Sequence, residues 1–213
     1  MSLKGKIILS VLATVFAWIL IDLYYPYQTD IRKVDGAYVA RLDADMWRSY
    51  YENKKAKLFF QSAQLMRGQF HFPFIRSHVV SVYVAEAAFV FKKGKSRDDY
   101  NKALPPLRKY FASVNDISTI KFNIDSAALT ELEWWIIRRD TTVKPTEWEG
   151  WLAATASVMY HKPVDDFREY AHLRVQAMVL RDQKNKDITE ADWGMILNIL
   201  NKAWSSFAVA CNK

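Results

Sequence analysis

Hydrophobic residues recur every three or four positions through most of the chain beyond residue 35. In the stretch GAYVARLDADMWRSYYENK, Leu42, Met46 and Tyr50 fall on one face, which is the periodicity of an amphipathic α-helix. Proline, glycine and capping residues mark the ends of further helices. The predicted helices cover residues 35–53, 55–70, 73–93, 96–115 with a break at Pro105 and Pro106, 125–140, 145–160, 163–185 and 189–207. We therefore predict an all-α fold, with one N-terminal transmembrane helix followed by a single bundle of seven to eight helices.

The stretch VVSVYVAEAAFVF lies inside the predicted helix 73–93 and is apolar except for Ser81 and Glu86. It is too short to cross a membrane and too long for a typical strand. We therefore expect this helix to be the most buried one of the bundle.

An apolar run without any charged residue extends from Ile7 to Ile21, and Asp22 and a group of tyrosines follow it. Residues 7–25 come close to the roughly 20 positions that a helix needs to cross a bilayer, and tyrosines are frequent at the membrane interface. The pattern predicts an uncleaved signal-anchor over residues 1–27, in contact with the lipid bilayer through residues 7–25, and a globular all-α domain over residues 28–213. A cleaved signal peptide and a buried helix of a soluble protein are the alternatives.

The orientation of this segment follows from the positive charges on its two sides. Lys4 and Lys6 precede the apolar run, and Arg32, Lys33 and Arg41 follow it, so the comparison is nearly balanced. A short basic leader before an apolar run usually stays in the cytoplasm. We expect a single-pass protein of the bacterial inner membrane with its C-terminal domain in the periplasm.

Composition excludes several classes of protein. The chain has 213 residues, 51% of them hydrophobic, and only six glycines and six prolines, which is typical of a folded helical domain. A single cysteine, Cys211, excludes an internal disulfide and a cysteine-based zinc site. The net charge of +7 is spread along the chain and accompanies no nucleic-acid-reading motif, so we do not expect nucleic-acid binding.

One stretch, EYAHLRVQAM, contains Glu169 and His172 at the Glu-x-x-His spacing of di-metal helical bundles. Such a site needs a second copy of the motif and ligands on the inward face of the helix, and the chain has only one copy. On a helical wheel, these two residues lie on a polar arc away from the apolar cluster. They are weak metal-ligand candidates, and a solvated helix face is the alternative.

Carboxylates on apolar faces are stronger candidates for chemistry. Glu86 stands between two alanines, and Glu133 shares a helix face with leucines and an isoleucine. A buried carboxylate must be paired, hydrogen-bonded or protonated, and Arg67, Arg76 and Arg138 are possible partners. If Glu86, Glu133 and His71 met in one cavity, they would be catalytic candidates. A structural ion pair inside the bundle is the alternative.

Standard catalytic and nucleotide-binding motifs are absent from the sequence, and we expect no cofactor. The segments DMWRSYYE, FHFPF, ALPPL, ELEWW and EADW together resemble an uncharacterised family of bacterial proteins with one N-terminal hydrophobic helix and an all-helical domain. The resemblance implies a bacterial origin and no particular activity.

Three functions are consistent with these observations. The first is a membrane-anchored accessory or interaction protein with a protein partner, for example a subunit of a larger membrane assembly, which an exposed aromatic patch would favour. The second is an enzyme or ligand-binding protein that uses a buried carboxylate and histidine site. The third is electrostatic docking on anionic lipid or nucleic acid, which requires several lysines on one surface, namely Lys54, Lys55, Lys57, Lys92, Lys93 and Lys95.

Overall fold

The chain is all-helical wherever the structure describes it. The computed structural model describes residues 2–213, which are 81% helical and contain no β-strand. The α-helices are α1 (Leu3–Tyr24), α2 (Gly36–Tyr51), α3 (Lys55–Phe70), α4 (Phe74–Lys93), α5 (Arg97–Asn101), α6 (Leu104–Ile117), α7 (Ile124–Arg139), α8 (Pro145–Tyr160), α9 (Arg168–Lys184) and α10 (Glu190–Asn212), with the 3-10 turns η1 (Val164–Phe167) and η2 (Asn185–Asp187).

Nine α-helices follow α1 in the described part of the chain, close to the seven or eight that the sequence predicts. The extra helix is the five-residue α5, which ends before Pro105 and Pro106 and is separate from α6. The two prolines occupy the first turn of α6, where a missing backbone N–H costs no hydrogen bond. Thr189 and Asp192 form a capping box at the start of α10.

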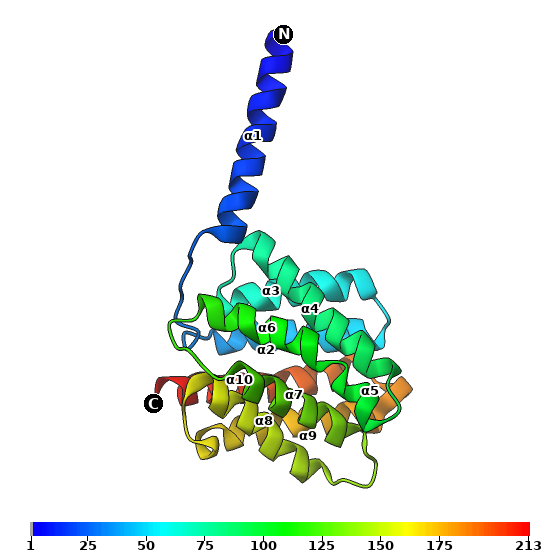
Figure 1. Cartoon of the computed structure of the whole chain (residues 1–213). Coiled ribbons are helices and arrows are strands. Elements are labelled where there is room, and N and C mark those ends of the chain that lie inside the picture. Colours follow the sequence, from blue (N-terminus) through cyan, green and yellow to red (C-terminus); the bar gives the residue numbers. More distant parts are fainter. Residues whose placement is uncertain (1) are drawn as a thin grey trace.

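Helices α2 to α10 form a ring in which neighbours along the chain contact each other, apart from the short α5. The ring closes where α10 packs against α2. In Figure 1, α3 and α4 lie on the side of the domain next to α1, and α8 and α9 lie on the opposite side. The linker after α1 is tied to this ring, because the backbone of Thr29 exchanges hydrogen bonds with Ile117 and Thr119.

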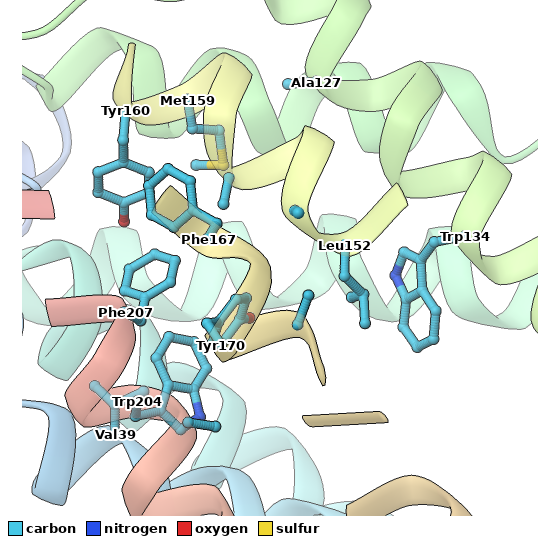
Figure 2. Close-up of a cluster of buried hydrophobic side chains, with 14 of the residues drawn as sticks. Val39, Ala127, Trp134, Leu152, Met159, Tyr160, Phe167, Tyr170, Trp204 and Phe207 are labelled. Carbon is cyan, nitrogen blue, oxygen red and sulfur yellow. The ribbon is translucent and has the colours of Figure 1, made fainter. Parts of the chain in front are cut away.

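Aromatic side chains from α8, η1, α9 and α10 fill the centre of the ring (Figure 2). The ring of Phe207 lies 5.1 Å from those of Tyr160 and Trp204 and 4.7 Å from that of Tyr170, measured between centroids. Tilted and edge-on contacts between aromatic rings add to the stability that the core gains from burying apolar area. Trp134, Trp148 and Trp204 are also buried in the core.

A buried ion pair crosses this core. The carboxylate of Asp43 in α2 accepts a hydrogen bond from the indole N–H of Trp204 at 3.0 Å and pairs with Arg174 of α9 at 3.2 Å. Arg174 also donates to the hydroxyl of Tyr170. Asp43 therefore connects α2 to α9 and α10, which lie more than 100 residues further along the chain, and the pair accounts for the charge of Asp43 in an apolar interior.

The prediction that helix 73–93 is the most buried is wrong. In α4, the buried side chains are small or short, namely Ser77, Val80, Ser81 and Ala87. Ser81 accepts a hydrogen bond from Ser62 of α3 at 3.1 Å. Small residues let two helix backbones come close together. Helix α4 therefore turns Ser81 towards α3, and it leaves Val82 and Phe89 exposed on its other side.

Helix α1 projects from the domain, and its apolar side chains are uncovered (Figure 1). Two helices in residues 2–213 have the length and composition of a membrane span, α1 with a mean hydropathy of 2.3 and α4 with 1.4. Only 6% of the apolar window of α1 is buried, so α1 is not a core helix of the domain.

We predict that Gly36→Ala destabilises the domain by about 1–3 kcal/mol, because added atoms cannot enter a well-packed contact without displacing the backbone. A Cβ atom at residue 36 would lie 2.6 Å from the carbonyl oxygen of Trp204, where α2 meets α10. Chemical denaturation of the purified protein measures the change. Gly150→Ala is the matched control, because nothing lies within 4 Å of its added Cβ, and we expect it to stabilise α8 by about 0.5–1 kcal/mol. Equal effects of the two substitutions would contradict the close α2–α10 contact.

Candidate functional site

The three predicted catalytic candidates lie apart. His71 ends α3 in a left-handed conformation, and its Nε2 atom lies 2.8 Å from the carbonyl oxygen of Lys33. His71 lines a shallow, open hollow at the base of α1, and neither Glu86 nor Glu133 lines that hollow. Glu86 is exposed on α4, and Glu133 lies on α7.

The expected burial and partners of these glutamates are also wrong. Glu86 lies on the outward side of α4, so it needs no buried partner. Glu133 is partly buried and forms an ion pair with Arg97 of α5, whereas the sequence suggested Arg67, Arg76 or Arg138. Sequence periodicity places residues on a helix face but cannot identify which neighbouring element covers that face. The Glu133–Arg97 contact is therefore the structural ion pair that was considered as the alternative.

Glu169 and His172 are both exposed on α9, as the polar arc of the helical wheel predicts. The Nδ1 atom of His172 lies 2.9 Å from the carboxylate of Glu149 in α8, and its Nε2 atom lies 2.9 Å from the amide of Gln176. Glu169 takes no part in these contacts. Within residues 2–213, no group of three or more histidine, cysteine, aspartate or glutamate side chains is placed to hold a metal ion.

Sequence reasoning missed the carboxylate with the most unusual surroundings, Glu131. Its Oε1 atom accepts hydrogen bonds from the indole N–H groups of Trp134 at 3.0 Å and Trp135 at 2.8 Å. Burial raises the pKa of Glu131, although the two indole donors and the charge of Arg174 act in the opposite direction. The spacing Glu-x-x-Trp-Trp was the available signal, since residues three and four positions apart share a helix face.

The described surface instead has an unusual apolar stripe on α4. Phe74, Val79, Val82 and Phe89 are 47%, 38%, 51% and 54% exposed. Such a row of large apolar side chains on one helix is a candidate interaction site. In Figure 1, α4 starts beside α1 and slopes away from it, so the stripe begins at the base of α1 and continues down the domain.

Aromatic rings connect this stripe to α1 and to α3. The ring of Phe74 lies 6.2 Å from that of Trp18 in α1 and 4.7 Å from the imidazole of His78. The imidazole lies 6.0 Å from the ring of Phe59 and 6.1 Å from that of Phe60. Phe60 is 58% exposed and Trp18 is 47% exposed. The uncovered apolar surface therefore continues from α1 across the start of α4 to the outer face of α3.

The carboxylate of Asp22 attaches α1 to the domain. Its two oxygens accept the backbone N–H groups of Ile75 at 3.1 Å and Arg76 at 3.0 Å, in the first turn of α4. The guanidinium of Arg76 donates in return to the backbone carbonyls of Asp22 and Tyr25 at the end of α1. An anion therefore lies at the N-terminus of α4 and a cation at the C-terminus of α1, and both positions are favoured by the helix dipoles.

Lysines gather at the other end of the α3–α4 pair. Because Ser62 and Ser81 meet near the middle of two antiparallel helices, the start of α3 lies beside the second half of α4. Lys92 lies 5.9 Å from the ring of Tyr50 at the end of α2, and Lys54 pairs with Glu52. Two of the six lysines that the third function requires, Lys54 and Lys92, therefore lie near the end of α2, and the full set is Lys54, Lys55, Lys57, Lys92, Lys93 and Lys95.

No family model, no curated protein and no solved structure matches this chain. Its resemblance to a bacterial family with an N-terminal hydrophobic helix therefore stays a prediction. Function has to be inferred from the surfaces and contacts described above.

We predict that Asp22→Ala loosens α1 from the domain, because it leaves the first N–H groups of α4 without their acceptor. Loss of such a cap costs about 0.5–2 kcal/mol. Spin labels on Ser10→Cys in α1 and Thr141→Cys after α7 report the distance between α1 and the domain. We expect a broader distance distribution in Asp22→Ala than in the native chain, and an intermediate one in Asp22→Asn, which keeps an acceptor. Asp35→Ala removes the cap of α2 instead and is the control; broadening in this variant equal to that of Asp22→Ala would contradict the attachment role.

We also predict a pH effect from Glu131, whose pKa in the folded protein is raised above the ordinary carboxyl value of 4.5. A group that binds its proton more tightly in the folded state stabilises that state at low pH, and this contribution is lost as the pH rises above the ordinary pKa. The native protein should therefore lose stability relative to Glu131→Gln between pH 4.5 and the raised pKa. Denaturation curves of both proteins across this range measure the difference. Glu133→Gln is the control on the same helix, and an identical pH trend in the two variants would contradict the assignment.

Proposed function

We propose that this protein is a single-pass, membrane-anchored helical accessory protein that contributes its domain to a larger membrane assembly. Helix α1 crosses the bilayer of the bacterial inner membrane as an uncleaved signal-anchor. The domain of α2 to α10 lies on the periplasmic side. The exposed apolar stripe of α4 is the observation that carries this proposal, because an exposed patch of this kind marks an interaction site.

The attachment of α1 supports an anchor that positions the domain. Asp22 and Arg76 join the end of α1 to the start of α4 through hydrogen bonds in both directions. A cleaved signal peptide needs no such contact with the mature domain. The contact therefore favours an uncleaved segment that holds the domain in a fixed orientation at the membrane surface.

The second half of the α4 stripe, which holds Val82 and Phe89, supports a protein partner. Val82 and Phe89 are both more than half exposed, and α4 leads them away from the base of α1. The exposed carboxylate of Glu86 lies on the same side of the helix. Apolar side chains around a single charge fit a protein surface, which can supply both an apolar pocket and a pairing cation.

The separation of His71, Glu86 and Glu133 gives the enzyme alternative no support from a shared pocket. The exposed stripe therefore leaves the accessory function as the better supported of the two.

A photo-crosslinking amino acid at residue 89, introduced in the full chain in cells, tests the proposal. We expect a defined crosslinked protein of the same membrane from this position. The same crosslinker at Met195, which is 47% exposed on α10, is the control and should give no such product. Phe89→Ser should reduce co-purification of that partner at least severalfold without changing the thermal unfolding of the domain, because Phe89 is mostly outside the core.

Membrane insertion and orientation require a separate measurement. We expect the chain to resist carbonate extraction and its domain to be digested by protease in spheroplasts but not in intact cells. A monomer of unchanged mass in mild detergent, together with equal crosslinking from residues 89 and 195, would contradict the accessory function even if the anchor were confirmed.

A further inference from the structure

The outer face of α3 carries aromatic and cationic side chains next to the membrane anchor. Phe60 is 58% exposed, and Lys57 and Gln64 are exposed on the same side of the helix. Arg67, one turn further, places its guanidinium 5.0 Å from the ring centroid of Phe74 at the start of α4. On this face, the apolar ring of Phe60 therefore lies between the positive charges of Lys57 and Arg67.

The direction of α3 makes this face a candidate surface for the membrane itself. In Figure 1, α3 runs across the direction of α1, on the side of the domain from which α1 leaves. If α1 crosses the bilayer, α3 lies along the plane of that bilayer. The Asp22 and Arg76 contacts fix this geometry, because they join α1 to the helix that follows α3.

We propose that the outer face of α3 and the first turn of α4 rest on the same bilayer that α1 crosses, with Phe60 and Phe74 at the level of the lipid headgroups and the cations of α3 against anionic lipid phosphates. This inference rests on the proposed anchoring by α1. It identifies the lipid surface, and not a second protein, as the occupant of this part of the apolar surface.

Continuity with the anchor is the first argument for a lipid occupant. The rings of Trp18, Phe74, His78 and Phe60 form an unbroken path from α1 to α3, with centroid separations of 4.7–6.2 Å. Trp18 lies six residues, or nearly two turns, before the end of α1, in the part of the helix towards the interface where tryptophan and tyrosine are enriched in membrane proteins. Aromatic residues that contact it laterally lie at a similar depth.

Charge is the second argument. Lys55 and Lys57 in the first turn of α3 are exposed, and the chain as a whole carries a net charge of +7. A helix with aromatic side chains and cations on its outer face binds at the interface of anionic membranes, where lysine and arginine attract the lipid phosphates. Glu86, the exposed carboxylate of α4, lies in the second half of that helix, which slopes away from α1 in Figure 1.

Fluorophores at single cysteines in the full chain, reconstituted into nanodiscs with anionic lipid, test this inference. Cys211 is buried, and burial raises the pKa of its thiol to about 12, so it stays nearly unreactive at neutral pH. The introduced positions are Gln64→Cys on the outer face of α3, Ser10→Cys in the middle of α1, and Thr141→Cys in the exposed loop between α7 and α8, on the far side of the domain. Nitroxide-labelled lipids then quench whichever fluorophores touch the bilayer.

We expect lipid quenchers to remove most of the fluorescence from the labels at residues 10 and 64 and to leave the label at residue 141 unchanged. Lys55→Gln with Lys57→Gln, or discs without anionic lipid, should reduce quenching at residue 64 but not at residue 10. Phe60→Ser should do the same, and because Phe60 is mostly exposed the domain should keep its thermal stability. Lys184→Gln, on α9, is the control for a change of charge alone.

The outcomes separate the inference from the proposed function. Quenching at residue 10, with residue 64 as unquenched as residue 141, would overturn the inference while the anchor stands. A label at residue 64 that is shielded from water but not quenched by lipid would assign this face to a protein, such as a second copy of the chain, and would also overturn it. The absence of quenching at residue 10 would contradict membrane anchoring itself.

Discussion

The carboxylate of Asp22 at the first turn of α4 is the contact on which the position of the whole domain depends. Without it, α1 would be an apolar helix on a linker, free to take many orientations. With it, two N–H groups in the first turn of α4 donate to the carboxylate of Asp22, and the guanidinium of Arg76 donates to backbone carbonyls at the end of α1. This reciprocal contact gives the apolar segment a defined direction relative to the domain, and it determines which surface of the domain is nearest to the base of α1.

The packing of α4 follows from a second constraint, the close approach of α3 and α4. Ser62 and Ser81 meet in this contact, and no large side chain could replace them without separating the helices. Phe74, Val79, Val82 and Phe89 of α4 lie outside the core and form the exposed stripe. The surface that we propose for lipid and for a protein partner is thus a consequence of how tightly two helices pack. The buried Asp43–Arg174 pair and the aromatic cluster around Phe207 hold the remainder of the ring together.

The candidate site residues show which properties a helical wheel predicts and which it does not. The wheel was correct for His172, whose polar arc faces solvent. The expected burial of Glu86 was wrong, because α4 is apolar around its whole circumference and its periodicity gives no direction for the core. Glu131 was missed, although the spacing Glu-x-x-Trp-Trp on its own helix was a local signal. A residue's partner on another helix depends on packing, which local periodicity does not contain.

The sequence by itself determined the all-helical class, most helix boundaries and the uncovered apolar segment at the N-terminus. These depend on local properties, namely the spacing of apolar residues, capping side chains, and the positions of proline and glycine. Only the tertiary structure decided which side of α4 is exposed, that Arg97 pairs with Glu133, and that Asp22 joins α1 to the domain. Each of these contacts links residues tens of positions apart, and they form only when several helices pack at once, because the free energy of burial depends on the whole arrangement and not on one segment.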